Sequence, residues 1–160
     1  MGLWEWLFGK KKEEEKGYAA GSYEVSRAFA RNVFASSSFE YPGVLAKDQT
    51  YLLLQEDKLK DFVEKYWDVT TMSYHSESDE FPDCDDFAVI TFSGMIRGAI
   101  KEGFKYPPLF GEVSYKKKSG GYHRVNWAVA SPDKLMFFEP QTGKWFKDFS
   151  DVEFLTNVEI

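Results

Sequence analysis

Residues 81–101 read FPDCDDFAVITFSGMIRGAIK, and this stretch decides the fold class. Its apolar residues recur every three or four positions, which predicts a buried helix from near Asp85 to about Lys101. Before the helix, Pro82 and Asp83 mark the end of a loop. Small side chains on the helix would let another element approach it closely, at Ser93, Gly94 and Gly98.

Two earlier segments carry the same helical periodicity. Residues 23–34 place Val25, Phe29 and Val33 at helical spacing, which predicts a helix there. Residues 56–67 have one apolar stripe with charged residues opposite, as an amphipathic helix requires. The stripe consists of Leu59, Phe62, Val63, Tyr66 and Trp67.

After residue 101 the apolar period changes to two, the spacing of half-buried strands. Short turn signals separate these segments, and such short connections favour antiparallel neighbours. The predicted strands cover residues 111–116, 122–130, 134–141, 144–149 and 152–160. The sequence therefore predicts an α+β fold, in which N-terminal helices pack on a C-terminal antiparallel meander.

The composition excludes several classes of protein. Of 160 residues, 43% are hydrophobic and 18% aromatic, which is far too apolar for a disordered chain. The net charge of -6 argues against nucleic-acid binding, which depends on Lys and Arg. No apolar run is long enough to cross a bilayer, no signal peptide is recognisable, and one cysteine allows no internal disulfide. We therefore expect a cytoplasmic protein.

The first 17 residues differ from the rest of the chain. Leu3, Trp4, Leu7 and Phe8 fall at helical spacing and are followed by blocks of lysine and glutamate. One interpretation is an interfacial anchor that binds a membrane weakly, and the other is a helical tag that docks on a protein domain and ends in a linker. We favour the second, and we expect one domain over residues 18–160.

The single cysteine, Cys84, stands immediately before the predicted helix of residues 85–101. Cysteine reacts as its thiolate, which a helix N-terminus and a neighbouring imidazolium both stabilise. His123 begins a predicted strand on its apolar face, and Glu139 and Gln141 share one face of the next strand. A histidine and an acid on apolar faces need polar partners, although a core histidine can also be satisfied by the backbone.

The segments DCDDFA (83–88), GYHRVNWAVA (121–130) and KLMFFEPQTGKW (134–145) together resemble the papain-like and transglutaminase-like cysteine hydrolases. They are most similar to the papain-like C-terminal domain of a mushroom agglutinin and to related bacterial and phage proteins. The resemblance covers about Leu52 to Trp145. The short start of the chain also resembles phage-encoded proteins, which would place the protein in a bacterial host.

The resemblance implies a papain-like fold and a peptidase or amidase that acts on a peptide or amide substrate. Cys84 would be the nucleophile of an acyl-enzyme, and His123 the general base and later the acid. Glu139 would orient the imidazole, with Gln141 as the alternative. Two other functions are compatible with the same fold: a catalytically inactive binding or phage-associated module, and transglutaminase-type acyl transfer to an amine.

Acidic residues crowd the cysteine, and carboxylates beside a thiol disfavour its ionised form. A cation would offset them, and the agglutinin domain that the chain resembles is activated by a divalent metal. Asp83, Asp85 and Asp86 are the candidate ligands of Ca²⁺ or Mn²⁺. The alternative is that these acids cap helices and face water. The second histidine, His75, falls in a polar stretch and is predicted on a surface loop.

Overall fold

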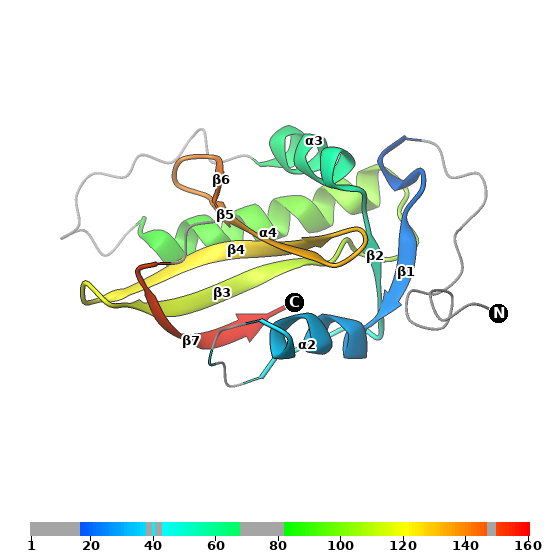
Figure 1. Cartoon of the computed structure of the whole chain (residues 1–160). Helices are drawn as coiled ribbons and strands as arrows, with labels where there is room; N and C mark the ends of the chain where they lie inside the picture. Colours follow the sequence, from blue (N-terminus) through cyan, green and yellow to red (C-terminus); the bar gives the residue numbers. More distant parts are fainter. Residues whose placement is uncertain (1–16, 38–39, 41–42, 68–81, 147–149) are drawn as a thin grey trace.

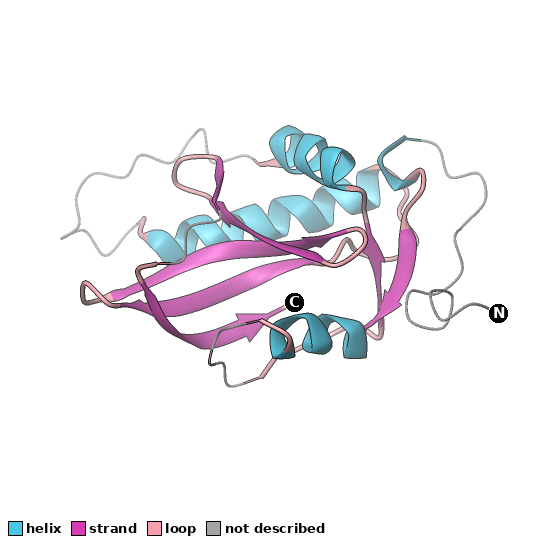
Figure 2. Ribbon diagram, in the orientation of Figure 1, coloured by secondary structure: helices cyan, strands magenta, loops and turns pink. Residues whose placement is uncertain are grey.

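A five-stranded antiparallel sheet is the centre of the protein in the computed structural model, which describes residues 17–37, 40, 43–67, 82–146 and 150–160 (Figure 1). The strand order is β6-β5-β4-β3-β7. The prediction of helices combined with an antiparallel sheet is confirmed (Figure 2). The strands are β3 (Phe110–Lys117), β4 (Tyr122–Ala130), β5 (Lys134–Glu139), β6 (Lys144–Phe146) and β7 (Val152–Glu159).

The predicted meander holds for four strands and is wrong for the fifth. Strands β3 to β6 pair in succession, as short turns require. Strand β7 crosses to the far edge and pairs with β3, with Val113 opposite Val158. Burial of apolar side chains explains this position of β7, because Leu155 and Val158 join the core beside β3.

Helices α3 (Glu56–Tyr66) and α4 (Cys84–Lys101) cover one face of the sheet. Their close approach depends on glycine, as the sequence predicts. A Cβ atom at Gly98 would lie 2.5 Å from Cγ of Tyr66, and one at Gly94 would lie 2.6 Å from the carbonyl oxygen of Tyr66. The two helices can therefore pack only while these positions lack side chains.

Helix α2 (Arg27–Ala35) lies on the other face, where it buries Phe34 against Trp127 of β4. The two rings meet edge to face, with centroids 4.7 Å apart. The indole Nε1 donates to the carbonyl oxygens of Glu112 and Glu159, which lie on β3 and β7. Trp127 thus joins three neighbouring strands and the helix above them.

A separate two-stranded sheet corrects the prediction of one helix over residues 23–34. Strand β1 (Tyr23–Ser26) pairs with β2 (Thr50–Leu53), and α2 begins only at Arg27. The Ser26 hydroxyl accepts from the amide of Phe29 at 3.4 Å and caps the helix. Val25 is buried, but it belongs to strand β1 and not to the helix. Its i, i+4 spacing from Phe29 therefore does not reflect a helical face.

Both edges of the large sheet are short or covered. Strand β6 has three residues. At the opposite edge, the amide of Leu45 donates to the carbonyl of Val158, and the amide of Ile160 donates to the carbonyl of Leu45. The amide of Leu155 donates to the carbonyl of Glu40.

The predicted boundary at residue 17 falls at the short 3₁₀ helix η1 (Gly17–Ala19). The predicted helical tag and the loop with His75 lie outside the described residues. Within the described part of the chain, no helix has both the length and the apolar character needed to cross a membrane.

Candidate functional site

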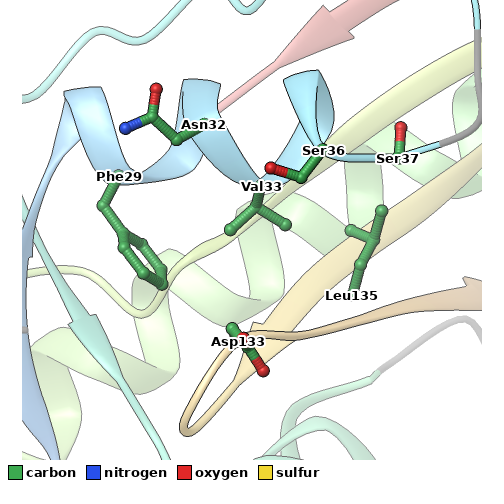
Figure 3. Close-up of a pocket in the computed structure, with 7 residues that line it drawn as sticks. All are labelled: Phe29, Asn32, Val33, Ser36, Ser37, Asp133 and Leu135. Carbon is green, nitrogen blue, oxygen red and sulfur yellow. The ribbon is translucent and has the colours of Figure 1, made fainter. Parts of the chain in front are cut away.

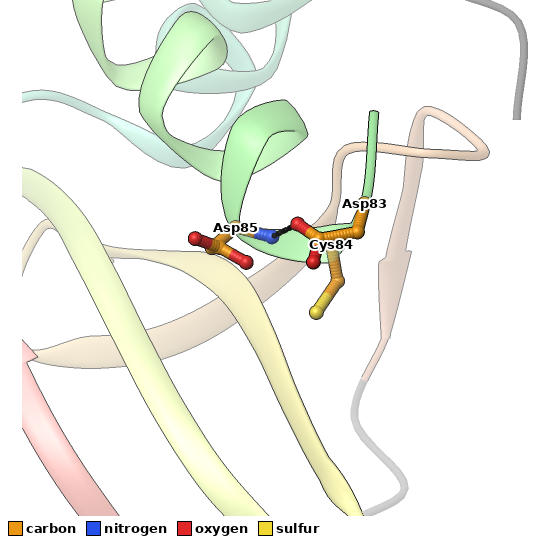
Figure 4. A group of neighbouring side chains, drawn as sticks. All are labelled: Asp83, Cys84 and Asp85. Atoms are coloured by element: carbon orange, nitrogen blue, oxygen red, sulfur yellow. Dashed lines mark hydrogen bonds between the residues drawn. The ribbon is translucent and has the colours of Figure 1, made fainter. Parts of the chain in front are cut away.

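The start of α4 is fixed by a capping box built from aspartates. The Asp83 carboxylate accepts from the amide of Asp85 at 3.2 Å (Figure 4), and the Asp86 carboxylate accepts from the amide of Asp83 at 3.0 Å. The arrangement satisfies orphan amides of the first turn and favours negative charge at the helix N-terminus. Cys84 is therefore the first residue of α4, and it is half-buried.

His123 and Glu139 meet where β4 begins and β5 ends. Nε2 of His123 lies 2.6 Å from Oε2 of Glu139. The other carboxylate oxygen, Oε1, accepts from the backbone amide of Gln141 at 3.2 Å. Of the two residues predicted to orient the imidazole, Glu139 therefore contacts it, and Gln141 holds Glu139 through its main chain.

Cys84 is the second side chain that interacts with the His123 imidazole, and it raises the pKa of the ring. The structure thus brings together three of the four predicted residues, which we call the Cys84–His123–Glu139 cluster. Their sequence positions are far apart, but a helix start and two adjacent strands bring them to one place. The ring of Tyr115 on β3 lies edge-on to the imidazole, with centroids 5.6 Å apart.

The cluster favours a positive charge on His123. Burial is the largest single effect and would lower the pKa of His123, but the hydrogen bonds with Cys84 and Glu139 outweigh it together and raise this pKa to about 9. At neutral pH the cluster therefore contains an imidazolium beside a carboxylate. Burial, reinforced by the charge of Glu139, also raises the pKa of Tyr115 to about 12, so this hydroxyl stays protonated.

A buried amide that sequence reasoning missed joins α4 to the sheet. Nδ2 of Asn126 donates to the carbonyl of Ala88 at 3.0 Å and to that of Gly111 at 3.2 Å. Asn126 is fully buried, and its Oδ1 has no hydrogen-bond partner among the described residues. The sequence does contain a signal for this residue: Asn126 is a polar residue on the same strand face as Ala128 and Ala130, the face that α4 covers.

The aspartates form a weaker metal-binding set than the sequence suggests. Ligand atoms of Asp83, Cys84 and Asp85 lie within 4.8 Å of one another, but the Asp86 carboxylate is engaged in the capping box. A hydrogen bond between Asp83 and Asp85 lowers the pKa of Asp83 and raises that of Asp85, so the two carboxyl groups titrate as an interacting pair. Two such carboxylates and a sulfur fall short of the six to eight oxygens that Ca²⁺ takes.

In chemical terms, the cluster is a dense set of donors and acceptors at a helix N-terminus. It brings together a cysteine side chain, an imidazolium and the carboxylate that is hydrogen-bonded to it, with the Asp83 carboxylate one residue from Cys84. Side-chain exposure of 17% for His123 and 20% for Glu139 leaves both within reach of a ligand.

Comparison with known proteins connects this chain with agglutinins. The model of the family described as "Agglutinin C-terminal" matches residues 51–145. No curated protein matches the chain.

Two solved structures share the fold. One is described as "PSL1a-E64 complex", with a TM-score of 0.65 and 23% identity over 83% of this chain and 51% of that chain. The other is Polyporus squamosus lectin bound to the human-type influenza-binding epitope Neu5Aca2-6Galb1-4GlcNAc, with a TM-score of 0.62 and 22% identity over 83% of this chain and 49% of that chain. The chain thus spans about half the length of these structures.

These comparisons overturn the predicted cysteine peptidase or amidase, together with its peptide or amide substrate and the related acyl-transfer alternative. They lead to an agglutinin family and a lectin bound to a glycan, and not to a cysteine hydrolase. The physical reason is that a thiol, an imidazole and a carboxylate in contact also satisfy one another as a polar cluster. Their order along the chain predicted the contact correctly, but a contact alone does not establish a reaction.

Proposed function

Because this chain belongs to the agglutinin C-terminal family, we propose that it is a glycan-binding domain. The observation that carries the proposal is the glycan epitope bound to Polyporus squamosus lectin, whose fold this chain shares over 83% of its length. The chain covers 49% of that lectin, so glycan binding by this half is itself part of the proposal.

We place the ligand at the Cys84–His123–Glu139 cluster because sugar hydroxyl groups both donate and accept hydrogen bonds. The imidazolium of His123 is a charge-assisted donor, and the carboxylates of Glu139 and Asp83 are charge-assisted acceptors. Both kinds of partner stand within one cluster, as a ligand rich in hydroxyl groups requires.

An exposed aromatic ring offers a further contact at this end of β4, from the opposite face of the strand. Tyr122 precedes His123 on β4 and is 65% exposed, whereas the other aromatic rings that the structure describes are buried or half-buried. Tyrosine offers a ligand an apolar face and a polar hydroxyl together. A sugar ring has the matching character, since its C–H groups are apolar and its edge is polar.

Two expectations from the sequence stay as proposals beside this one. Binding of Ca²⁺ or Mn²⁺ by Asp83 and Asp85 would need further oxygen ligands. A papain-like arrangement is supported by a helix-start cysteine beside a histidine on a strand, and we propose it for the architecture alone.

The test is a glycan array probed with the full chain, followed by titration calorimetry on the ligands found. We include the epitope Neu5Aca2-6Galb1-4GlcNAc among the glycans. We expect saturable binding that Glu139→Gln weakens by about tenfold, because a charged acceptor is lost. The matched control is Glu64→Gln, which removes an exposed carboxylate from α3 and should leave binding unchanged.

Two results would overturn the proposal. The first is the absence of binding to every glycan on the array by a folded chain. The second is turnover of a peptide or amide substrate that Cys84→Ser abolishes. Glycan binding that is indifferent to both Glu139→Gln and His123→Ala would contradict the position of the site.

A further inference from the structure

A cavity lies at the end of β4 that is opposite to the Cys84–His123–Glu139 cluster. It is bounded by one side of α2 with the two residues after it, and by the turn between β4 and β5 with the start of β5 (Figure 3). His123 is the second residue of β4 and Asp133 follows the strand, so the two places are separated by about 24 Å of extended chain. The residues lining the cavity are Phe29, Asn32, Val33, Ser36, Ser37, Asp133 and Leu135.

The cavity has the size of a small ligand. Its volume is about 360 Å³, near the lower end of the range for ligand sites, which is roughly 300–1,000 Å³. One sugar ring or a similar small molecule would therefore fill it, and an extended oligosaccharide would have to leave it through the open side.

The lining of the cavity has an apolar part and a polar part. Phe29 and Val33 project from α2 toward the turn, and Leu135 lines the cavity from β5 (Figure 3). Ser36 and Ser37 line the end of the helix, and the Ser37 hydroxyl donates to the carbonyl of Phe34 at 2.6 Å, which leaves its oxygen able to accept. A ring with an apolar face and a hydroxylated edge matches both the apolar and the polar part of this lining.

Two polar groups of the cavity have no protein partner. The Ser36 hydroxyl and the Asp133 carboxylate make no hydrogen bond or ion pair with another residue in the part of the chain that the structure describes. The Asn32 amide lies on the outer side of α2, away from Asp133, and so belongs to the rim (Figure 3). Ser36 and Asp133 therefore remain available to ligand hydroxyl groups.

The charge of the cavity selects among sugars. Among the described residues that line it, Asp133 is the only charged one. The end of α2 adds the negative pole of a helix dipole, because Ser36 is its C-cap. Both features repel an anion and favour a neutral or positively charged group.

We propose that this cavity is a second binding site, which takes a single neutral or amine-bearing sugar ring and rejects acidic sugars. The class of ligand rests on the proposed glycan-binding function, whereas the position and charge preference rest on the cavity itself. The ring would pack on Phe29 and Leu135 and would donate hydroxyl or ammonium hydrogens to Asp133.

The test is an amide NMR titration of the full ¹⁵N-labelled chain with three probes: methyl β-galactoside, glucosamine and N-acetylneuraminic acid. We expect saturable shifts at Val33, Ser36 and Leu135 with the first two probes and none with the third. Ser36→Trp, which fills the cavity from an exposed position, should weaken binding by about tenfold or more.

The second variant, Asp133→Asn, is conservative and keeps the cavity open. It should allow N-acetylneuraminic acid to produce saturable shifts at Val33, Ser36 and Leu135, because a like charge is removed. Its matched control is Asp61→Asn on the exposed side of α3, which should change nothing.

The outcomes separate the two proposals. If Ser36→Trp is folded and leaves all shifts unchanged, the second site is overturned while glycan binding at the Cys84–His123–Glu139 cluster stands. If Asp133→Asn does not alter the preference among the three probes, the charge selection is overturned. A third outcome supports the second site against the first. In it, Ser36→Trp abolishes the shifts at the cavity, and Glu139→Gln leaves binding to the glycan array unchanged.

Discussion

The two halves of β4 differ in burial and in chemistry. Residues 122–124 are polar and exposed or half-buried, and residues 125–130 are buried. The first half holds His123, whose partners are side chains, whereas the second half holds Trp127, whose partners are the core and the main chain. A single strand thus anchors the fold with one half and presents polar groups with the other, so we expect stability and ligand binding to respond to different substitutions.

The buried half should be the more sensitive to truncation. Trp127→Ala removes a fully buried indole together with its hydrogen bonds to two neighbouring strands. We expect the free energy of unfolding to fall by about 3–5 kcal/mol. Chemical denaturation followed by circular dichroism measures this, and a loss below about 1 kcal/mol would show that the two halves do not differ as described.

The polar half should be sensitive to pH. The pKa of His123 is raised to about 9 from an unfolded value near 6.5, so its contribution to stability is complete below pH 6.5 and is lost as the pH rises through 9. The contribution is about 3 kcal/mol at most. We would measure the midpoint by NMR titration of the imidazole and the free energy of unfolding at pH 6.5 and 9.5.

The control for this prediction is Glu139→Gln, which removes the carboxylate beside Nε2. It should lower the midpoint of the His123 titration and flatten the difference in stability between the two pH values. A midpoint near 6.5 in the unaltered protein would mean that the cluster does not hold an imidazolium at neutral pH.

Asn126 is the polar residue of the buried half, so its substitution should have an intermediate effect. Asn126→Ala leaves the carbonyls of Ala88 and Gly111 without their shared donor, and we expect a loss of about 1–3 kcal/mol. Asn126→Asp should cost more, because it places an acceptor between two acceptors in a buried site. Equal losses for the two variants would indicate that the amide does not join α4 to the sheet.

Periodicity alone predicted the elements that are locally amphipathic. Helices α3 and α4 and strand β4 were predicted almost to their ends, because each carries its own apolar face. Strand β1 was missed, because its pairing with β2 joins residues more than twenty positions apart and leaves no local pattern. The place of β7 in the sheet depends on the assembled core in the same way.

The candidate site was partly predictable for similar reasons. Cys84, His123 and Glu139 stand at recognisable element ends, and the fold brings them together. Their use was not predictable, because a hydrogen-bonded cluster is compatible with binding as well as with catalysis. The cavity at Asp133 had no signal, since its two walls come from segments about a hundred residues apart.

The edges of the sheet also bear on how the protein behaves in concentrated solution. An exposed strand edge is a template on which another chain can add a strand, and long, flat edges promote aggregation. Strand β6 offers only three residues, and residues around Leu45 already occupy amides and carbonyls along the β7 edge. Among the described residues, little main chain remains for such pairing, so we expect the folded domain to resist edge-to-edge association despite its large content of Phe, Tyr and Trp.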